Sequence, residues 1–370
     1  MRVAIFIPSF GDGGAERMLV NLASALVARG VSMDFLTRSR KVPYLDGLDP
    51  AVQLIETGRG GLLTQQLLLR RYLRAARPDV VLCGKDKAGE AMQLARRLSG
   101  VPVRIVMRPG TSYSARFAEL RPFSRWRARL RVRRVYGAAD AVVGNSEAVV
   151  ADVAAAAGLP AARLHLIRNP VVTPRLFAQA REALDHPWFA AGQPPVVLGV
   201  GRLGQVKGFD VLIEAFAQLR AQRPARLMIL GEGRLREALA AQAARLGVAD
   251  DVALSGFDAN PYRYLARAAL FVLSSRREGS PNALTEALAL GVPVVSTDCP
   301  AGPREVLRGG EVAPLVPVDD VAAMAAAMAG ALDAPGDAER RRDAVLEYSA
   351  ATCAERYHVL FESLLAQRAA

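Results

Sequence analysis

Two carboxylates, Glu278 and Glu286, lie eight residues apart just after the apolar run 271–273. If a helix starts between them, Glu286 can accept hydrogen bonds from the vicinal hydroxyl groups of a ribose, and Glu278 in the preceding turn can reach a sugar ring. Charge-assisted hydrogen bonds of this kind contribute about 1.5–3 kcal/mol each. The alternative is that Glu286 only interacts with the helix dipole and that Glu278 is a solvated loop charge. The two residues alone leave both interpretations open.

The helix between these carboxylates is predicted from its capping residues. Ser280 followed by Pro281 is a typical N-cap and first-turn pair, and Gly291 is a typical stop, so we expect a helix over residues 280–290. The amides of its first turn have no partner within the helix and can bind a diphosphate at the carboxyl end of a sheet. These amides belong to Asn282, Ala283 and Leu284.

Two sets of short apolar runs must position this helix. They alternate with segments of helical periodicity, which is typical of parallel α/β sheets. Prolines crowd residues 169–195 and indicate a connection between two domains. Residues 338–370 contain no predicted strand and favour one or two amphipathic helices, with Tyr348, Tyr357, Leu360, Phe361 and Leu364 on the apolar face. The predicted strands are 3–7, 31–36, 80–82, 103–106 and 141–143 in the first half, and 195–200, 226–230, 252–254, 271–273 and 293–295 in the second.

Length and composition agree with a two-domain globular protein. The chain has 370 residues, of which 51% are hydrophobic and 23% charged. No apolar run approaches the roughly 20 residues of a spanning helix, and we expect a cytoplasmic protein. Cys83, Cys299 and Cys353 lack the spacing of a disulfide framework or a zinc site.

The positive charge is concentrated in the first half of the chain. Residues 1–170 hold 27 Lys and Arg against 13 Asp and Glu, whereas residues 171–370 hold 21 against 23. Within residues 116–134, eight arginines alternate with aromatic and aliphatic side chains, which predicts a basic amphipathic helix on an anionic membrane surface. The alternative is a solvated helix packed on its own domain. The predicted membrane-facing residues are Arg121, Arg125, Trp126 and Arg129.

The segment 277–298 resembles the E-x7-E signature of the family 4 glycosyltransferases. With its continuation Cys-Pro-Ala-Gly-Pro-Arg-Glu at 299–305, it is similar to the bacterial branch that builds cell-surface polysaccharides. The family's other motifs match at 13–16, 201–208 and 230–233. The resemblance implies an α/β protein of GT-B fold, in which two Rossmann-like doubly wound domains face a cleft. It implies an acceptor-binding domain at 1–172, a nucleotide-sugar domain at 173–348, and a helix at 349–370 that returns to the first domain.

The same resemblance assigns roles to individual residues. Arg202 and Lys207 would hold the donor's diphosphate, Glu278 the transferred sugar and Glu286 the ribose, and the first three would be the catalytic residues. Two cations can offset the charge that develops on a departing nucleoside diphosphate. Lys207 is also one of only four lysines among 48 basic residues. The other predicted donor-binding residues are Gly13, Gly14, Gly231, Gly279, Pro281, Asn282, Ala283 and Leu284.

No D-x-D motif occurs in the chain, so no metal and no cofactor are predicted. Arg202, Lys207 and the helix N-terminus would neutralise the diphosphate instead. The glycine-rich turn 11–14 is an alternative dinucleotide motif, but its third glycine position holds Glu16. On the acceptor side, the resemblance implies Glu16 and Arg108. The latter stands near the place where many relatives have a histidine, and His165 is predicted to be structural.

These observations predict a retaining glycosyltransferase. It would move a sugar from a nucleotide donor, with UDP favoured, to a lipid-linked or glycan acceptor for cell-surface polysaccharide. The partners would be that donor, that acceptor and the anionic inner face of the cell membrane, with no nucleic acid. The alternatives are another GT-B activity such as a nucleotide-sugar epimerase, and a nucleic-acid-binding protein that uses the basic N-terminal surface.

Overall fold

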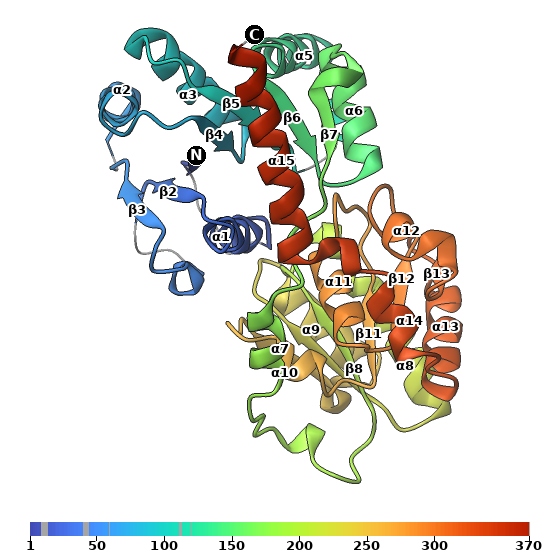
Figure 1. Ribbon diagram of the computed structural model, residues 1–370. Helices are drawn as coiled ribbons and strands as arrows, with labels where there is room; N and C mark the ends of the chain where they lie inside the picture. Colours follow the sequence, from blue (N-terminus) through green and yellow to red (C-terminus); the bar gives the residue numbers. More distant parts are fainter. Residues whose placement is uncertain (9–13, 40–43, 59, 111–112, 119, 370) are drawn as a thin grey trace. The chain divides into compact units, whose positions relative to one another are not determined.

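The computed structural model describes residues 1–8, 14–39, 44–58, 60–110, 113–118 and 120–369 and divides the chain into two compact domains. The N-terminal domain comprises Met1–Val171 and Tyr348–Ala370, and the C-terminal domain comprises Val172–Glu347. Each is built on one parallel sheet, which confirms the predicted doubly wound α/β fold class (Figure 1). The predicted boundaries, after residues 172 and 348, lie one residue from those in the structure.

The N-terminal domain consists of a parallel sheet with helices on both faces. Its strands are β1 (Arg2–Ile7), β2 (Ser32–Thr37), β3 (Gln53–Glu56), β4 (Val80–Cys83), β5 (Arg104–Met107), β6 (Ala141–Gly144) and β7 (Leu164–Leu166). Its helices are α1 (Gly14–Val27), α2 (Leu62–Ala76), α3 (Asp86–Ser99), α4 (Tyr113–Ala118), α5 (Pro122–Gly137), α6 (Glu147–Ala157) and α15 (Ala350–Ala369). The strand order is β3-β2-β1-β4-β5-β6-β7.

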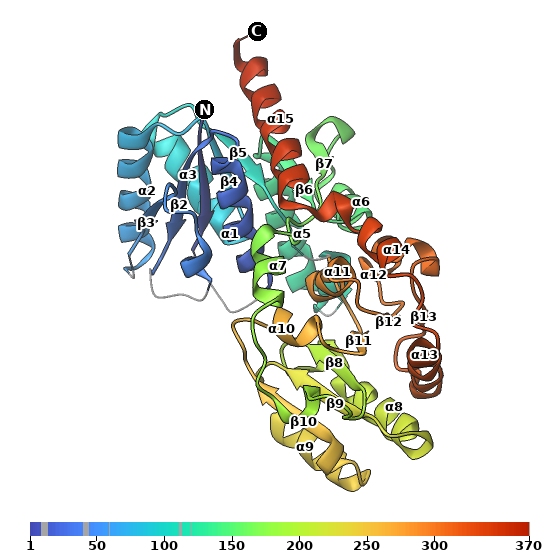
Figure 2. The same ribbon diagram turned by 60° about the horizontal axis from the view of Figure 1, so that its bottom comes forward.

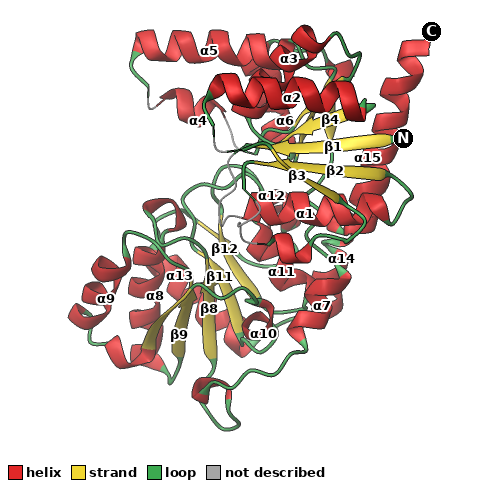
Figure 3. Ribbon diagram, turned by 90° about the vertical axis from the view of Figure 1, so that its left-hand side faces the viewer, coloured by secondary structure: helices red, strands yellow, loops and turns green. Residues whose placement is uncertain are grey.

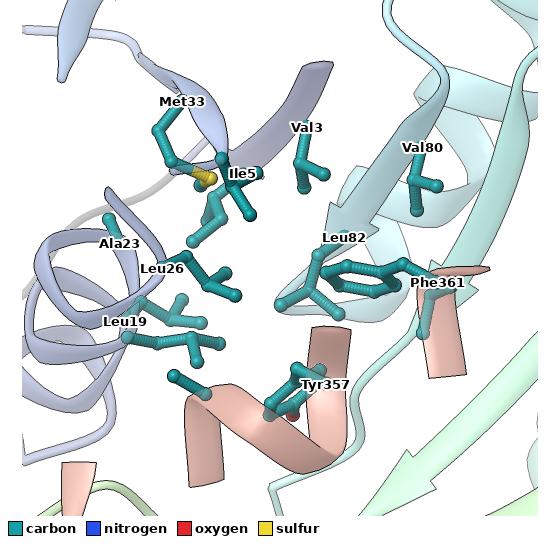
Figure 4. Packing of buried hydrophobic residues seen from close by; sticks show 14 of the residues in the cluster. Val3, Ile5, Leu19, Ala23, Leu26, Met33, Val80, Leu82, Tyr357 and Phe361 are labelled. Atoms are coloured by element: carbon teal, nitrogen blue, oxygen red, sulfur yellow. The ribbon is translucent and has the colours of Figure 1, made fainter. Parts of the chain in front are cut away.

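Alternation along each strand divides this core between the two faces of the sheet. Val3 and Ile5 of β1 pack with α1 and α15, whereas Ala4 and Phe6 pack with α2, α3, α5 and α6. Tyr357 and Phe361 of α15 are fully buried against the first face (Figure 4). The predicted return of the C-terminal helix to the first domain is therefore confirmed, and Figure 2 shows α15 beside α1 and β5.

The C-terminal domain repeats the arrangement with six strands. These are β8 (Val196–Val200), β9 (Arg226–Leu230), β10 (Val252–Gly256), β11 (Leu270–Leu273), β12 (Val294–Thr297) and β13 (Leu315–Val316). The helices are α7 (Pro174–Ala180), α8 (Phe209–Gln222), α9 (Arg236–Arg245), α10 (Tyr262–Leu265), α11 (Asn282–Ala289), α12 (Pro303–Val306), α13 (Val321–Asp333) and α14 (Ala338–Asp343). The order β10-β9-β8-β11-β12-β13 makes β8 and β11 neighbours (Figure 3). Helices α8, α9 and α13 pack on one face, and α11 contacts β11 and β12.

Three strands that the sequence analysis missed, β3, β7 and β13, all lie at a sheet edge. An edge strand is half-exposed, so its sequence lacks the continuous apolar run of a central parallel strand. In β3 both end residues, Gln53 and Glu56, are exposed, and β13 has only two residues. Most of the predicted strands are buried on both faces, and the exception is β10, which lies at an edge and is only partly buried.

Candidate active site

The turn between β11 and α11 differs from its prediction at the helix start. The structure begins α11 at Asn282, with Pro281 in the cap position and therefore no side-chain capping hydrogen bond. Pro281 packs against Gly302, where an added Cβ would lie 2.6 Å from the proline Cδ. This contact fixes Pro281 outside the helix, at a ψ of 85°. The first-turn amides are still those of Asn282, Ala283 and Leu284, and the Leu284 side chain is fully buried in the core.

Lys207 and Glu278, which are 71 residues apart, meet at this turn. Lys207 Nζ lies 2.7 Å from Glu278 Oε1, and the buried Ser275 donates its hydroxyl to the same oxygen at 2.6 Å. The side chains of Lys207 and Glu278 are 27% and 11% exposed, so the pair is only partly screened by water. The contact exists because β8 and β11 are parallel neighbours whose carboxyl ends lie at the same edge of the sheet.

Glycines bring the backbones around this pair into close contact. At Gly208, where φ is +62°, a Cβ would lie 2.1 Å from the Ser274 carbonyl oxygen. At Gly231, where φ is +143°, a Cβ would lie 1.9 Å from the Gly201 oxygen. The loop after β8 carries the exposed Arg202. Its Gly208 lies against the end of β11, and its Gly201 lies against the loop after β9. The predicted donor residues Arg202, Lys207 and Gly231 thus belong to adjoining loops at one sheet edge.

Glu286 occupies a more enclosed place than Glu278. It is 1% exposed and accepts a hydrogen bond of 3.3 Å from the Tyr262 hydroxyl. Asn260 accepts from the Tyr262 amide at 3.2 Å and donates to Glu182 at 2.8 Å, which ties the start of α10 to the segment after α7. Burying a carboxylate is costly without polar partners, and the Tyr262 hydroxyl is one such partner of Glu286. The alternative interpretation made Glu278 a solvated loop charge, but that side chain is only 11% exposed. Glu286 can accept hydrogen bonds from a diol.

The remaining residues of the family motif lie beside β12. Asp298 follows this strand and forms an ion pair with Arg304 of α12, with Nε and Oδ1 3.0 Å apart. Gly279, also a predicted donor residue, is buried with its carbonyl oxygen close to Gly302. Cys299 is buried, and burial together with the charge of Glu278 raises the pKa of its thiol to about 12. A neutral thiol of this kind is a packing group and not a nucleophile.

The site residues predicted in the N-terminal domain are Gly13 and Gly14 for the donor, and Glu16 and Arg108 for the acceptor. Gly13 lies outside the described residues, and Gly14 is the first residue of α1. Glu16 is 5% exposed and accepts from Lys85 Nζ at 2.8 Å. Arg108 is 3% exposed and hydrogen-bonds Asn169 and the Tyr357 hydroxyl. These bonds tie α15 to the sheet, and the acceptor role of Arg108 stays a prediction.

His165 lies on the edge strand β7 and is half-buried. Burial lowers the pKa of its imidazole.

The arginine-rich segment is not the single helix that we predicted. Pro122 starts a new helix, so residues 116–134 are divided between α4 and α5. Phe117 is 5% exposed and belongs to the core, whereas Trp126 is 60% exposed. Arg125 donates back to the Phe117 and Leu120 carbonyl groups, at 2.8 and 3.1 Å. The Arg125 guanidinium therefore closes the turn between the helices. The membrane-facing role of Arg121, Arg125, Trp126 and Arg129 stays a prediction.

Two residues of the candidate site were missed in the sequence, Ser275 and Tyr262. Ser275 is the second residue after β11, and its place at a strand end is the signal that could have identified it. Tyr262 had no such signal, because its contact with Glu286 spans 24 residues. Within the described ranges no group of three or more His, Cys, Asp or Glu residues could hold a metal ion.

Comparison with known families and proteins shows matches along most of the chain. Residues 12–175 match the family described as Glycosyltransferase Family 4, and residues 194–334 match Glycosyl transferases group 1. The lipopolysaccharide core biosynthesis glycosyltransferase LpsE of Rhizobium meliloti is 30% identical over 327 residues, which cover 86% of this chain and 85% of that protein. The Campylobacter jejuni N-acetylgalactosamine-N,N'-diacetylbacillosaminyl-diphospho-undecaprenol 4-alpha-N-acetylgalactosaminyltransferase is 27% identical over 330 residues, which cover 86% and 87%.

Solved structures with the same fold cover nearly the whole chain. Anabaena HepE in complex with UDP has a TM-score of 0.78 at 19% identity and covers 98% of this chain and 100% of that chain. Sucrose-phosphate synthase from Thermosynechococcus elongatus has a TM-score of 0.84 at 20% identity, with 99% of each chain covered. At 19% and 20% sequence identity, the structural similarity establishes the fold alone.

Proposed function

Because this chain belongs to the family 4 glycosyltransferases, we propose that it moves a sugar from a nucleoside diphosphate donor to a lipid-linked or glycan acceptor, with retention of configuration. The observation that carries this proposal is the Lys207–Glu278 pair beside the start of α11. It combines a cation for a diphosphate, the first-turn amides of a helix and a carboxylate for sugar hydroxyls at one sheet edge. UDP is the favoured nucleotide, since HepE of the same fold binds it.

The proposed roles follow from the geometry of the C-terminal domain. Arg202, Lys207 and the amides at the start of α11 would bind the diphosphate and stabilise the charge that develops on it as the glycosidic bond breaks. Glu278 would hold the transferred sugar, and Glu286 the ribose. No covalent nucleophile is assigned. The departing phosphate oxygen, positioned on the face where the acceptor attacks, could itself take the acceptor proton.

The acceptor is proposed to be anchored in a membrane. The Campylobacter relative is named for a diphospho-undecaprenol substrate, and the Rhizobium relative for lipopolysaccharide core biosynthesis. The basic first half of this chain, with an excess of fourteen positive charges, suits an anionic lipid surface. No helix in the described ranges is long and apolar enough to cross a bilayer. From the lipid-linked substrates named for the relatives, we propose a cytoplasmic enzyme that is peripheral at the inner face of the cell membrane.

The test is product analysis with purified protein, UDP-sugars and GDP-sugars, with and without lipid extract. The proposal predicts transfer of labelled sugar into the lipid fraction from one donor class, with the anomeric configuration of the donor retained. An isomerised nucleotide sugar formed without acceptor would instead indicate an epimerase, which the transferase names of the relatives do not favour. Salt-dependent nucleic-acid binding with no affinity for any nucleotide sugar would contradict the proposal.

A further inference from the structure

The exposed apolar side chains of this protein are concentrated on one helical layer. Helices α2, α3 and α5 cover the same face of the N-terminal sheet, with α3 in contact with both of the others (Figure 3). In the described part of the chain, fourteen large apolar side chains are exposed, and eight of them lie on these three helices. Monomeric proteins rarely expose apolar surface in such a concentration unless it is covered by a partner or a membrane.

Helix α5 presents an apolar stripe directly away from its own domain. Residues 122–131 are all described and none is buried, and the buried residues of the helix are Val132, Val135 and Tyr136. An α-helix turns about 100° per residue, so Phe123, Trp126 and Leu130 fall within about 60° of one another and about 160° from the centre of the buried face. They are 69%, 60% and 55% exposed. The stripe is therefore not part of the face by which the helix packs on its own domain.

Arginines border the stripe on both sides. By the same geometry Arg127 and Arg134 lie on one side of it and Arg133 on the other. The Arg127 guanidinium lies 5.9 Å from the centre of the Phe123 ring, and Phe123 stacks on Trp126 with their ring centres 6.1 Å apart. Aromatic rings bordered by arginines suit the boundary between lipid headgroups and acyl chains.

Helix α2 repeats this pattern. Its buried residues are Leu69, Tyr72 and Leu73, and the opposite side carries Leu63 and Leu67. These two leucines are 83% and 63% exposed. The stripe continues along the helix into a shallow hollow of about 530 Å³, lined by Leu67, Arg70, Arg71, Arg74 and Ala75. Residues 62–77 contain four arginines and no acidic residue.

Helix α3 lies between the other two and connects their surfaces. Leu94 and Leu98, which are 45% and 47% exposed, are on its outward side together with Arg97. The acidic residue on this outward side is Glu90, and Arg131 of α5 neutralises it through hydrogen bonds of 2.5 and 2.6 Å. The outward surface of the layer therefore combines apolar side chains with a net positive charge.

We infer that the outward face of α2, α3 and α5 is the surface that docks on an anionic membrane, with its leucine and aromatic side chains in the acyl-chain boundary. Charge complementarity favours an anionic membrane as the partner, because α5 and its cap carry seven arginines and no acidic residue. A second copy of the same face would bring like charges together. The inference deepens the proposed function by naming the surface through which the enzyme would reach a lipid-borne acceptor, and it rests on that membrane location.

The first test uses tryptophan fluorescence, because the chain has only two tryptophans. Trp188→Phe leaves Trp126 as the single emitter. The variant is mixed with vesicles of phosphatidylcholine alone or of phosphatidylcholine with phosphatidylglycerol. We expect a blue shift, and quenching by brominated acyl chains, with the anionic vesicles. Unchanged emission with the anionic vesicles would overturn the inference for α5.

The second test measures vesicle co-sedimentation of substituted proteins. Leu63→Ser with Leu67→Ser, and separately Phe123→Ser with Trp126→Ser, should each lower the partition coefficient about tenfold. Val359→Ser, at an exposed apolar position on α15, is the matched control and should change it less than about twofold. The inference would be overturned if all three substituted proteins showed the same change in partition coefficient. Dimerisation through this face in sedimentation velocity would also overturn it.

Donor binding separates this inference from the proposed function. The same variants should keep the UDP-dependent thermal shift of the wild type, because the substitutions are in the other domain. A protein that docks on vesicles but binds no nucleotide sugar would contradict the proposed function and leave the docking surface standing. A protein that binds the donor but not the vesicles would contradict the docking surface and leave the proposed donor binding standing.

Discussion

Replacing Glu278 by glutamine should tighten the binding of UDP while slowing transfer. The carboxylate touches Lys207, with Oε1 and Nζ 2.7 Å apart. A phosphate oxygen bonded to that Nζ at about 2.8 Å would lie at most about 5.5 Å from the carboxylate. Two negative charges at that distance repel by about 0.8 kcal/mol at the dielectric constant of water and about 3 kcal/mol at an effective value of about 20.

The expected change lies between these limits because Glu278 and Lys207 are 11% and 27% exposed. About 1.4 kcal/mol corresponds to a tenfold lower Kd for UDP. The turnover number should fall, since the variant loses its charge-assisted contact with the sugar. Glutamine keeps the size of the side chain and leaves Lys207 free to bind the phosphate.

Isothermal titration of UDP into the wild type and the variant measures this difference. Glu237→Gln is the matched control, because it removes one negative charge at an exposed position of the same domain. We expect that control to change the Kd less than about twofold. Unchanged or weaker UDP binding by Glu278→Gln would refute the placement of the diphosphate beside Lys207.

Three further predictions concern the same domain. Tyr262→Phe removes the hydrogen bond to Glu286 and should weaken UDP binding about three- to tenfold without changing the affinity for 2′,3′-dideoxy-UDP, as titration of both nucleotides would show. Transfer should persist in excess EDTA, and activity that returns only with added magnesium or manganese would contradict the metal-free diphosphate site. Gly208→Ala should lower the free energy of unfolding by more than about 3 kcal/mol in urea denaturation, because its Cβ would lie 2.1 Å from the Ser274 oxygen. Gly247→Ala, with a similar φ but open space, should cost only about 1 kcal/mol.

The sequence was sufficient to predict Lys207 and Glu278 as donor residues but not the contact between them. Each follows a predicted strand, and the family resemblance assigned both to the donor. Their contact depends on β8 and β11 being neighbours, and strand order is a property of the whole sheet. The same limit applies to Tyr262 and Glu286, which meet only after α10 and α11 have packed.

Capping residues also did not predict the starts of two helices correctly. Ser280 has the preferred N-cap chemistry, yet the helix starts at Asn282 and Pro281, which packs closely on Gly302, is the cap. Conversely, Pro122 is a clear start signal within residues 116–134, and weighing it would have separated Phe117 from the exposed stripe of α5.

The leucines of α2 show why exposure was the hardest property to predict. A run such as Leu62-Leu63 at the start of a helix favours burial by composition. The two side chains are 82% and 83% exposed, because the buried side of α2 begins only at Leu69. Which part of a helix reaches the sheet depends on where the neighbouring strands end, and that information is not local.

The account as a whole depends on a nucleoside diphosphate sugar binding to the C-terminal domain. The most direct measurement is titration of UDP-sugars and GDP-sugars into the wild type, Lys207→Ala and Glu286→Ala. We predict that one donor class binds the wild type and that each substitution weakens it at least about tenfold, because each removes a charge-assisted contact. Donor binding that is unchanged in both variants, or absent from the wild type, would contradict the account.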